Sequence, residues 1–240
     1  MNENLEALKN ELKKLKRHTR IKDAIFIVSL LVVVVIFTLN FKDNEFDKII
    51  RVQGIIVEDT DGKERILIGA PIPYAKNRAR TDTMKIKESW GKRLGKKYMG
   101  WYKEYSHEAN GIVILDENGW DKIIVGDPAP DPIIGKRIGN STGIIINDKT
   151  GLERTGYGIL DVDGSDRVVL GLDKDNGTEG ATLSVMPDGT TGLNLNSEKQ
   201  SIFIGKAAKG NWNSPDKQEF HGIIIRDEEN GKKIISQKDY

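Results

Sequence analysis

The sequence predicts a mainly β protein in which an N-terminal helix and a single transmembrane helix precede an extracytoplasmic domain of β-hairpin repeats. Three observations support this prediction: an uncharged apolar segment at residues 24–41, a repeated spacing of glycine and aspartate from residue 54 onward, and the absence of cysteine from all 240 residues. Without cysteine there is no disulfide framework, thiolate metal site or cysteine nucleophile. The expected organisation is a cytoplasmic helix at 1–23, a transmembrane helix at 24–41, a linker at 42–53 and a repeat domain at 54–240 with an insertion at 74–107.

Charge is distributed unevenly, although the formal net charge is only +1. Residues 1–41 carry +3 and residues 74–107 carry +7, so the rest of the chain carries −9. The neutral average therefore reflects cancellation between a basic stub, a basic insertion and an acidic repeat domain.

The apolar segment from Ala24 to Phe41 contains eighteen residues and no charge. A helix of that length spans about 27 Å, close to the thickness of a bilayer core. A cleaved signal peptide is the alternative, but no pair of small residues follows the apolar run, so an uncleaved signal-anchor is favoured. Basic residues precede the segment, which predicts a cytoplasmic N-terminus, an extracytoplasmic C-terminal domain and a location in the cell membrane.

The N-terminal stub has a leucine seam at Leu5, Leu8, Leu12 and Leu15. Spacings of three and four residues place these side chains on one helical face, which is typical of a coiled coil. An amphipathic helix lying on anionic lipid is the alternative, because lysines flank the seam.

Three segments that begin at Gly54, Gly111 and Gly143 share one spacing. Each has aspartate at the fifth position after the first glycine, glycine at the eighth, a basic residue at the eleventh and glycine at the fifteenth. The shared positions are Asp59, Asp116 and Asp148; Gly62, Gly119 and Gly151; and Arg65, Lys122 and Arg154. Looser copies begin at residues 158, 192 and 222.

Each copy predicts a β-hairpin. Isoleucine-rich and valine-rich runs suit strands, and the intervening Asp-x-x-Gly provides a side chain that bonds the turn and a residue free to take positive φ. A hairpin cannot bury its apolar face alone, so stacking of hairpins or association between chains must complete the core. The irregular spacing between copies favours a sandwich or barrel-like domain, with an intertwined oligomeric β-prism as the alternative.

Acidic turns invite a comparison with calcium loops. The segments Asp161–Asp166 and Asp173–Glu179 contain fragments of such loops, but neither completes the pattern with a glutamate at its twelfth position. Since Asp-Gly pairs are ordinary hairpin chemistry, we expect no metal and no cofactor.

The stretch from Gly126 to Gly164 combines an x-Pro-x-Pro linker, Gly-Lys-Arg and Asn-Asp…Glu-Arg-x-Gly-Tyr-Gly. It resembles a block found in uncharacterised bacterial single-pass membrane proteins, where short repeats similar to those near Leu183 and Leu193 follow. The resemblance covers roughly residues 50–205 and implies no activity. The insertion at 74–107 departs from the block.

The insertion combines ten basic residues with six of the sixteen aromatic residues of the chain. Cations interleaved with rings suit an anionic polymer or lipid headgroups. The candidate binding residues are Trp90, Lys92, Arg93, Lys96, Lys97, Tyr98, Trp101 and Tyr102. The alternative is a solvated loop whose rings pack over the first hairpin.

No spacing typical of an active site is present. His18, His107 and His221 do not form a metal-binding motif, and no nucleophile elbow or P-loop occurs. We therefore expect a structural or interaction module without catalytic activity, with a binding module for an anionic envelope polymer and a carboxylate-based hydrolase as the alternatives. The expected partners are the lipid bilayer and further copies of the chain, with no specific nucleic acid.

Overall fold

The computed structural model describes the backbone of residues 2–40 and 50–236. The chain divides into two compact units, Met1–Arg51 and Val52–Tyr240. Most of the expected linker, residues 42–49, lies outside the described residues.

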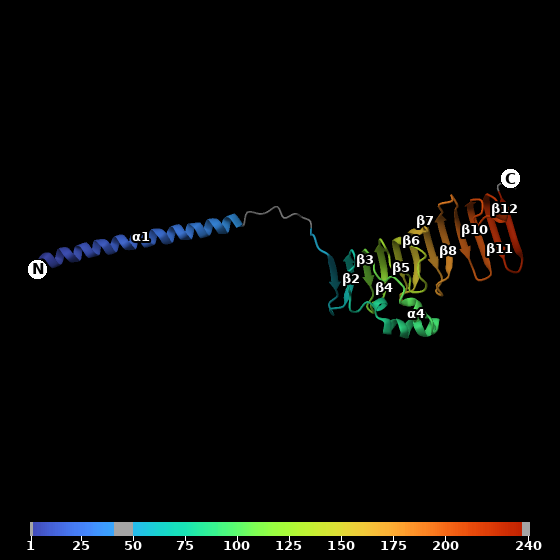
Figure 1. Ribbon diagram of the computed structural model, residues 1–240, viewed down its shortest axis with the longest axis horizontal. Coiled ribbons are helices and arrows are strands. Elements are labelled where there is room, and N and C mark those ends of the chain that lie inside the picture. The colour runs from blue at the N-terminus through green and yellow to red at the C-terminus, as the bar shows by residue number, and fades with distance from the viewer. Residues whose placement is uncertain (1, 41–49, 237–240) are drawn as a thin grey trace. The chain divides into compact units, whose positions relative to one another are not determined.

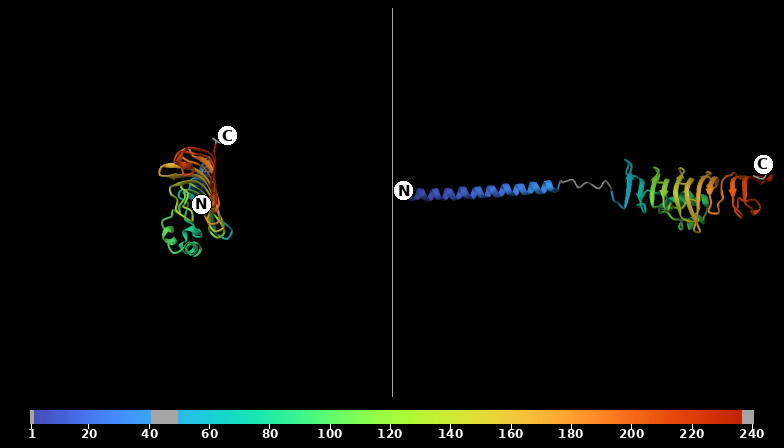
Figure 2. Two further views of the ribbon diagram at one scale, coloured as in Figure 1. Left: turned by 90° about the vertical axis from the view of Figure 1, so that its right-hand side faces the viewer. Right: turned by 90° about the horizontal axis from the view of Figure 1, so that it is seen from above.

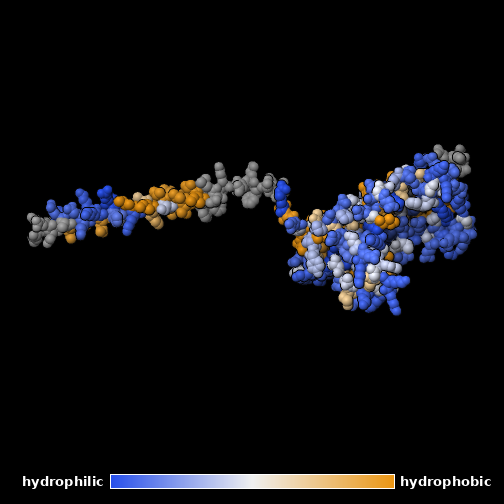
Figure 3. Space-filling view, viewed as in Figure 1, coloured by the Kyte–Doolittle hydropathy of each residue, from blue (hydrophilic) through white to orange (hydrophobic). Residues whose placement is uncertain are grey.

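The first unit is a single helix, α1 (Asn2–Asn40). Leu8, Leu12 and Leu15 of the expected seam are exposed, and the side chain of Leu5 lies outside the described set. The surface of α1 changes from hydrophilic to hydrophobic along the chain (Figure 3). Within the described residues, no helix meets both the length and the apolarity needed to cross a membrane. Residues 37–41 of the expected span lie outside the described side chains.

The second unit is built on one open antiparallel sheet of twelve strands, which lie side by side in chain order (Figure 1). The strands are β1 (Gly54–Glu58), β2 (Glu64–Gly69), β3 (Gly111–Leu115), β4 (Asp121–Gly126), β5 (Ser141–Asn147), β6 (Glu153–Val162), β7 (Ser165–Asp173), β8 (Glu179–Val185), β9 (Thr191–Asn196), β10 (Gln200–Ala207), β11 (Phe220–Asp227) and β12 (Gly231–Ser236). The prediction of a mainly β chain built from hairpins is confirmed.

The three strong repeats form hairpins with the same turn chemistry. In each, one carboxylate oxygen of the aspartate accepts hydrogen bonds from the backbone N–H groups two and four residues later, at 2.7–3.2 Å. The following glycines have φ of 75°, 81° and 79°. This conformation costs glycine little and other residues much, which explains the Asp-x-x-Gly signal.

The basic residue of each repeat connects neighbouring strands. Arg65 pairs with Asp59 at 3.2 Å and also donates to the carbonyl of Leu115. Lys122 donates to the carbonyl of Asn147 and Arg154 to that of Asp173. The basic residue thus pairs with the aspartate of its own repeat in the first copy, whereas in the other two copies it donates to a carbonyl of the next hairpin.

The expected sandwich or barrel-like closure is wrong, because the twelve strands form one open sheet whose first and last strands do not pair. Each hairpin adds its first strand to the last strand of the preceding hairpin in register. The long segments between repeats leave this register unchanged because they project from the sheet. Figure 2 shows the largest of them, the helical insertion, on one side of the sheet in the end-on view.

A glycine row crosses the sheet and sets the spacing of the repeats. The first and fifteenth positions of successive repeats pair with one another from Gly54 to Gly158, and the row resumes at Gly192, Gly205 and Gly222. Gly111 has φ of +150°, and a Cβ there would lie 2.0 Å from the carbonyl oxygen of Val125. The strands approach too closely along this row for most side chains, which explains why glycine recurs.

One face of the sheet, here called the covered face, carries the buried core. Its central row begins with Leu67, Val113, Ile124 and Ile145, which pack against residues of the connecting segments such as Ile72 and Ala109. At the C-terminal end the same face packs Phe203, Phe220 and Ile224 together.

Candidate functional site

The insertion at 74–107 forms a small helical layer at one end of strands β3–β6. Its elements are η1 (Ala79–Thr81), α2 (Thr83–Ile86), η2 (Lys87–Gly91), α3 (Lys92–Leu94) and α4 (Tyr98–Tyr102). They enclose a hydrophobic cluster to which Trp120 and Leu152 of the hairpin turns contribute. The layer is therefore a packed part of the unit.

The structure separates the predicted binding residues into two groups. Trp90, Tyr98 and Tyr102 are at most 2% exposed and belong to the hydrophobic cluster, so these rings are not accessible to a ligand. Tyr98 and Tyr102 donate hydrogen bonds to the carbonyls of Ile133 and Arg80. Burial raises the pKa of Tyr102 to about 12.

The predicted cations remain at the surface. Lys92, Lys96 and Lys97 are exposed, and Trp101 is 57% exposed beside them in sequence. Arg93 is also exposed, and its guanidinium lies 5.3 Å from the ring centroid of Trp90. A basic surface therefore exists, but Trp101 is the one accessible ring among the four predicted aromatic residues.

Two basic residues of the insertion are structural. Arg78 and Arg80 are 4% and 2% exposed, and both contact Asp121 at the start of β4. Burial opposes ionisation of Asp121, but the charges and hydrogen bonds of the two guanidinium groups outweigh it, and the pKa of Asp121 is lowered. His107 packs on Tyr102 nearby, and burial followed by repulsion from Arg80 and Arg78 lowers its pKa to about 4.

The second face of the sheet, here called the apolar face, contributes no residue to the three buried hydrophobic clusters, and no described segment of the chain covers it. One row on it contains a residue from every strand, each paired with the next, and all twelve are apolar or aromatic. The row runs Ile55, Ile68, Ile112, Val125, Ile144, Tyr157, Leu170, Leu183, Leu193, Ile204, Ile223, Ile235.

A parallel row on the apolar face runs from Val57 to Ile225 and contains only aliphatic residues and Thr155 before it ends at Lys233. Sixteen apolar residues of this face are each 36–58% exposed. Together they present on the order of 1,000 Å² of apolar surface, above the roughly 300–600 Å² of the largest patch on a typical monomer. Figure 3 shows apolar side chains reaching the surface of this unit among hydrophilic ones.

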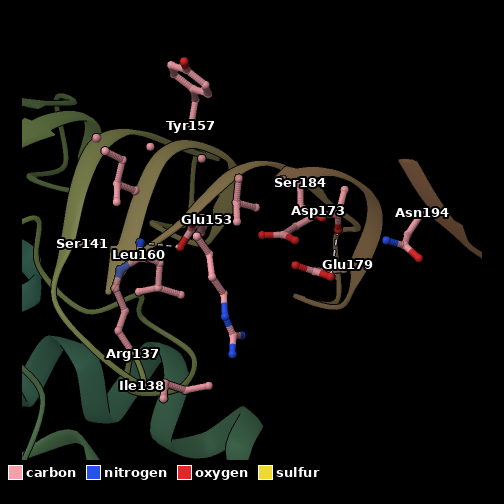
Figure 4. Close-up of a pocket in the computed structure, with 18 of the residues that line it drawn as sticks. Arg137, Ile138, Ser141, Glu153, Tyr157, Leu160, Asp173, Glu179, Ser184 and Asn194 are labelled. Atoms are coloured by element: carbon pink, nitrogen blue, oxygen red, sulfur yellow. Dashed lines mark hydrogen bonds and ion pairs between the residues drawn. The ribbon is translucent and has the colours of Figure 1, made fainter. Parts of the chain in front are cut away.

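The covered face is open in its middle, where a groove of about 530 Å³ crosses strands β6–β9. Glu153, Asp173 and Glu179 lie on this side of the strands, whereas Tyr157 projects from the opposite side (Figure 4). Arg137 pairs with Glu153 at 3.2 Å, and Thr182 donates to Glu179 at 2.9 Å.

The acids of the groove influence one another. Partial burial raises the pKa of Asp173 to about 6, with further contributions from the charges of Glu153 and Glu179. A carboxylate-based hydrolase would use two acids that converge in a cleft. The hydrolase itself stays a prediction.

The calcium-loop fragments do not assemble into a metal site. Gly164 donates its N–H to Asp161, and Thr178 donates to Asn176, so these polar side chains complete turns. Among the residues that the structure describes, no group of three or more histidine, aspartate or glutamate side chains is placed to hold a metal ion.

Comparisons of the chain with protein-family models, with curated proteins and with solved structures find no match. The resemblance to bacterial single-pass membrane proteins therefore stays a prediction.

Sequence reasoning did not find the groove or the extent of the apolar face. Both surfaces are assembled from residues in many strands, with no local motif. The signal that could have revealed them is alternation, since aligning the hairpins on their glycines places the apolar residues of every strand in common rows.

Proposed function

We propose that the chain is a membrane-anchored structural module without catalytic activity, whose extracytoplasmic sheets self-associate through the apolar face. The observation that carries the proposal is the unbroken apolar row from Ile55 to Ile235 on an uncovered surface. Burial of aliphatic surface is the main favourable term in protein association, at about 25 cal/mol for each Å² removed from water.

The composition of the apolar face favours a second copy of the chain over an unrelated partner. Transient interfaces are centred on aromatic residues and arginine, whereas Tyr157 is the single aromatic residue in the complete row. Rows of β-branched and leucine side chains are typical of the inner faces of a β-sandwich, which interdigitate about 10 Å apart. Obligate interfaces between subunits have the same composition, because they are as hydrophobic as the core of a domain.

Two further observations support self-association. A second sheet would match the length of the first, because both rows cross all twelve strands. The leucine seam of α1 would also favour association, since Leu8, Leu12 and Leu15 are exposed on the helix. Sheets of two or three copies would complete the core that each hairpin lacks, as expected for the oligomeric β-prism.

The membrane anchor belongs to the same proposal. Its support is the uncharged segment at 24–41, preceded by basic residues that favour a cytoplasmic N-terminus. Anchoring would concentrate copies in one plane, which raises the effective concentration for association.

Light scattering tests self-association on residues 50–240, because the three hydrophobic clusters lie entirely within this unit. We expect a mass of two or three chains. The double variant Leu170→Lys with Leu183→Lys, which places two like charges opposite each other in the row, should have the mass of one chain. Met84→Lys is the matched control, because Met84 is 64% exposed in the insertion, away from the apolar face.

A second candidate function is binding of an anionic polymer or lipid headgroups, which the exposed Lys92, Lys96 and Lys97 favour. With three of the four predicted rings buried, such binding would be mainly electrostatic and would weaken with salt.

A further inference from the structure

The central row of the covered face changes character in the middle of the sheet. It is apolar from Leu67 to Ile145 and again from Phe203 to Ile224, where other segments or side chains cover it. Between these parts the row consists of Gly156, Gly171, Thr182 and Asn194, each paired with the next. The open part of the covered face therefore has a floor of small and polar residues, whereas the residues paired along the row from Ile55 to Ile235 on the opposite face are all apolar or aromatic.

The groove is lined by buried polar side chains, one of which lacks a protein partner. Ser184 and Asn213 are 7% and 3% exposed and line the groove. Within the described part of the chain, the hydroxyl of Ser141, which also lines the groove, is buried and has no hydrogen-bond partner. Since buried polar groups are normally satisfied, groups of this kind at a groove indicate a ligand or ordered water.

The charges of the groove are mixed. Glu153, Asp173 and Glu179 stand along one edge, and Arg137 neutralises only the first of them through an ion pair. Arg167 lies at the groove with its guanidinium 5.9 Å from the ring centroid of Trp212, which is 63% exposed. The three acids would repel a polyanionic ligand, and the two arginines would repel a polycationic ligand.

We propose that this groove is a binding site for a polyhydroxylated ligand, namely an oligosaccharide. A hydroxyl group both donates and accepts, so it can donate to the carboxylates and accept from guanidinium and amide N–H groups. The exposed ring of Trp212 provides an apolar surface for the C–H face of a sugar ring. The floor crosses four strands, a length of about 14 Å, which accommodates several sugar rings in a row. The site lies on the face opposite the proposed self-association surface, so the two proposals stand independently.

The binding test uses the full chain in lipid nanodiscs and soluble oligosaccharides as probes: maltoheptaose, cellohexaose, the hexamer of N-acetylglucosamine and an oligogalacturonate. Isothermal titration calorimetry should give saturable binding of at least one neutral probe. Asn194→Ala should weaken that binding about tenfold, because the variant removes hydrogen bonds to the ligand from the floor. Asn118→Ala makes the same change at an exposed turn outside the groove and should leave the dissociation constant unchanged.

A second variant, Asp173→Asn, distinguishes weaker ligand binding from unfolding of the protein. It keeps the size of the side chain and removes only the charge, and the variant should weaken binding while its circular dichroism spectrum stays that of the unmodified chain. The proposal is overturned if none of the four probes binds, if only the oligogalacturonate binds, or if binding is unaffected by both groove variants.

Discussion

Arg78 donates two hydrogen bonds to Asp121, from Nε to Oδ1 at 2.8 Å and from Nη2 to Oδ2 at 2.5 Å. Both side chains are buried, and the pair joins the insertion to the first residue of β4. Arg78, a basic residue of the insertion, thus connects the helical layer to the sheet through a buried ion pair.

Removing Asp121 should destabilise the protein strongly. Asp121→Ala leaves two buried guanidinium groups without their carboxylate, and loss of one partner of a buried pair costs about 3–5 kcal/mol. Glu229→Ala breaks the exposed pair with Lys199 instead and should cost less than about 1 kcal/mol. Urea denaturation gives both free energies of unfolding, and equal values would contradict the structural role of Arg78.

The glycine row should tolerate no added methyl group where strands approach closely. A Cβ at Gly143 would lie 2.3 Å from the carbonyl oxygen of Tyr157, so Gly143→Ala should destabilise by about 1–3 kcal/mol. Gly100 in α4 has no atom within 4 Å of its Cβ position, and Gly100→Ala should be neutral or stabilising. A neutral Gly143→Ala in thermal unfolding would show that the row does not constrain the sheet.

Asp173 should make the folded unit less stable as pH rises. Its folded pKa of about 6 lies above the ordinary aspartate pKa of 3.8, so the folded state binds the proton more tightly. This contribution is fully present below pH about 4 and is lost as pH rises through 6. Asp173→Asn should therefore increase stability at pH 7.5 relative to the unmodified chain, and the difference should vanish near pH 4. Denaturation at both pH values measures this, and a difference that is independent of pH would contradict it.

The basic surface of the insertion should bind anionic membranes only weakly. Charge reversal of Lys92, Arg93, Lys96 and Lys97 should abolish any retention on anionic liposomes at low salt, because these cations are exposed. Tyr74→Ala, which removes a 75% exposed ring of the same insertion without changing its charge, is the control. Retention that persists after charge reversal across a salt series would exclude this surface as the binding site.

The sequence predicts the individual β-hairpins, but it does not predict how the hairpins pair to form the sheet. The hairpin turns followed from Asp59, Asp116 and Asp148, because the aspartate and the glycine that follows act within five residues. Pairing between hairpins has no such local signal, since an apolar strand face can pack in a sandwich or remain open for another chain. The sequence therefore does not predict one open sheet, although the repeated glycines that set the register of this sheet are recognisable in it.

The candidate site shows the same limit. Composition identified a basic, aromatic insertion, but it does not determine that Trp90 and Tyr98 turn inward while Lys92 and Lys96 face solvent. That choice depends on Trp120 and Leu152, which come from distant hairpin turns and complete the hydrophobic cluster. The groove likewise depends on a row of four residues from four strands, which is visible only once the register is known.

The central claim is that the apolar face is an interface between copies of this chain. Light scattering of residues 50–240, with and without Leu170→Lys and Leu183→Lys, tests it most directly. We expect a mass of two or three chains for the unmodified unit and of one chain for the double variant. A single-chain mass for the unmodified unit at micromolar concentration, or an unchanged oligomer in the variant, would contradict it.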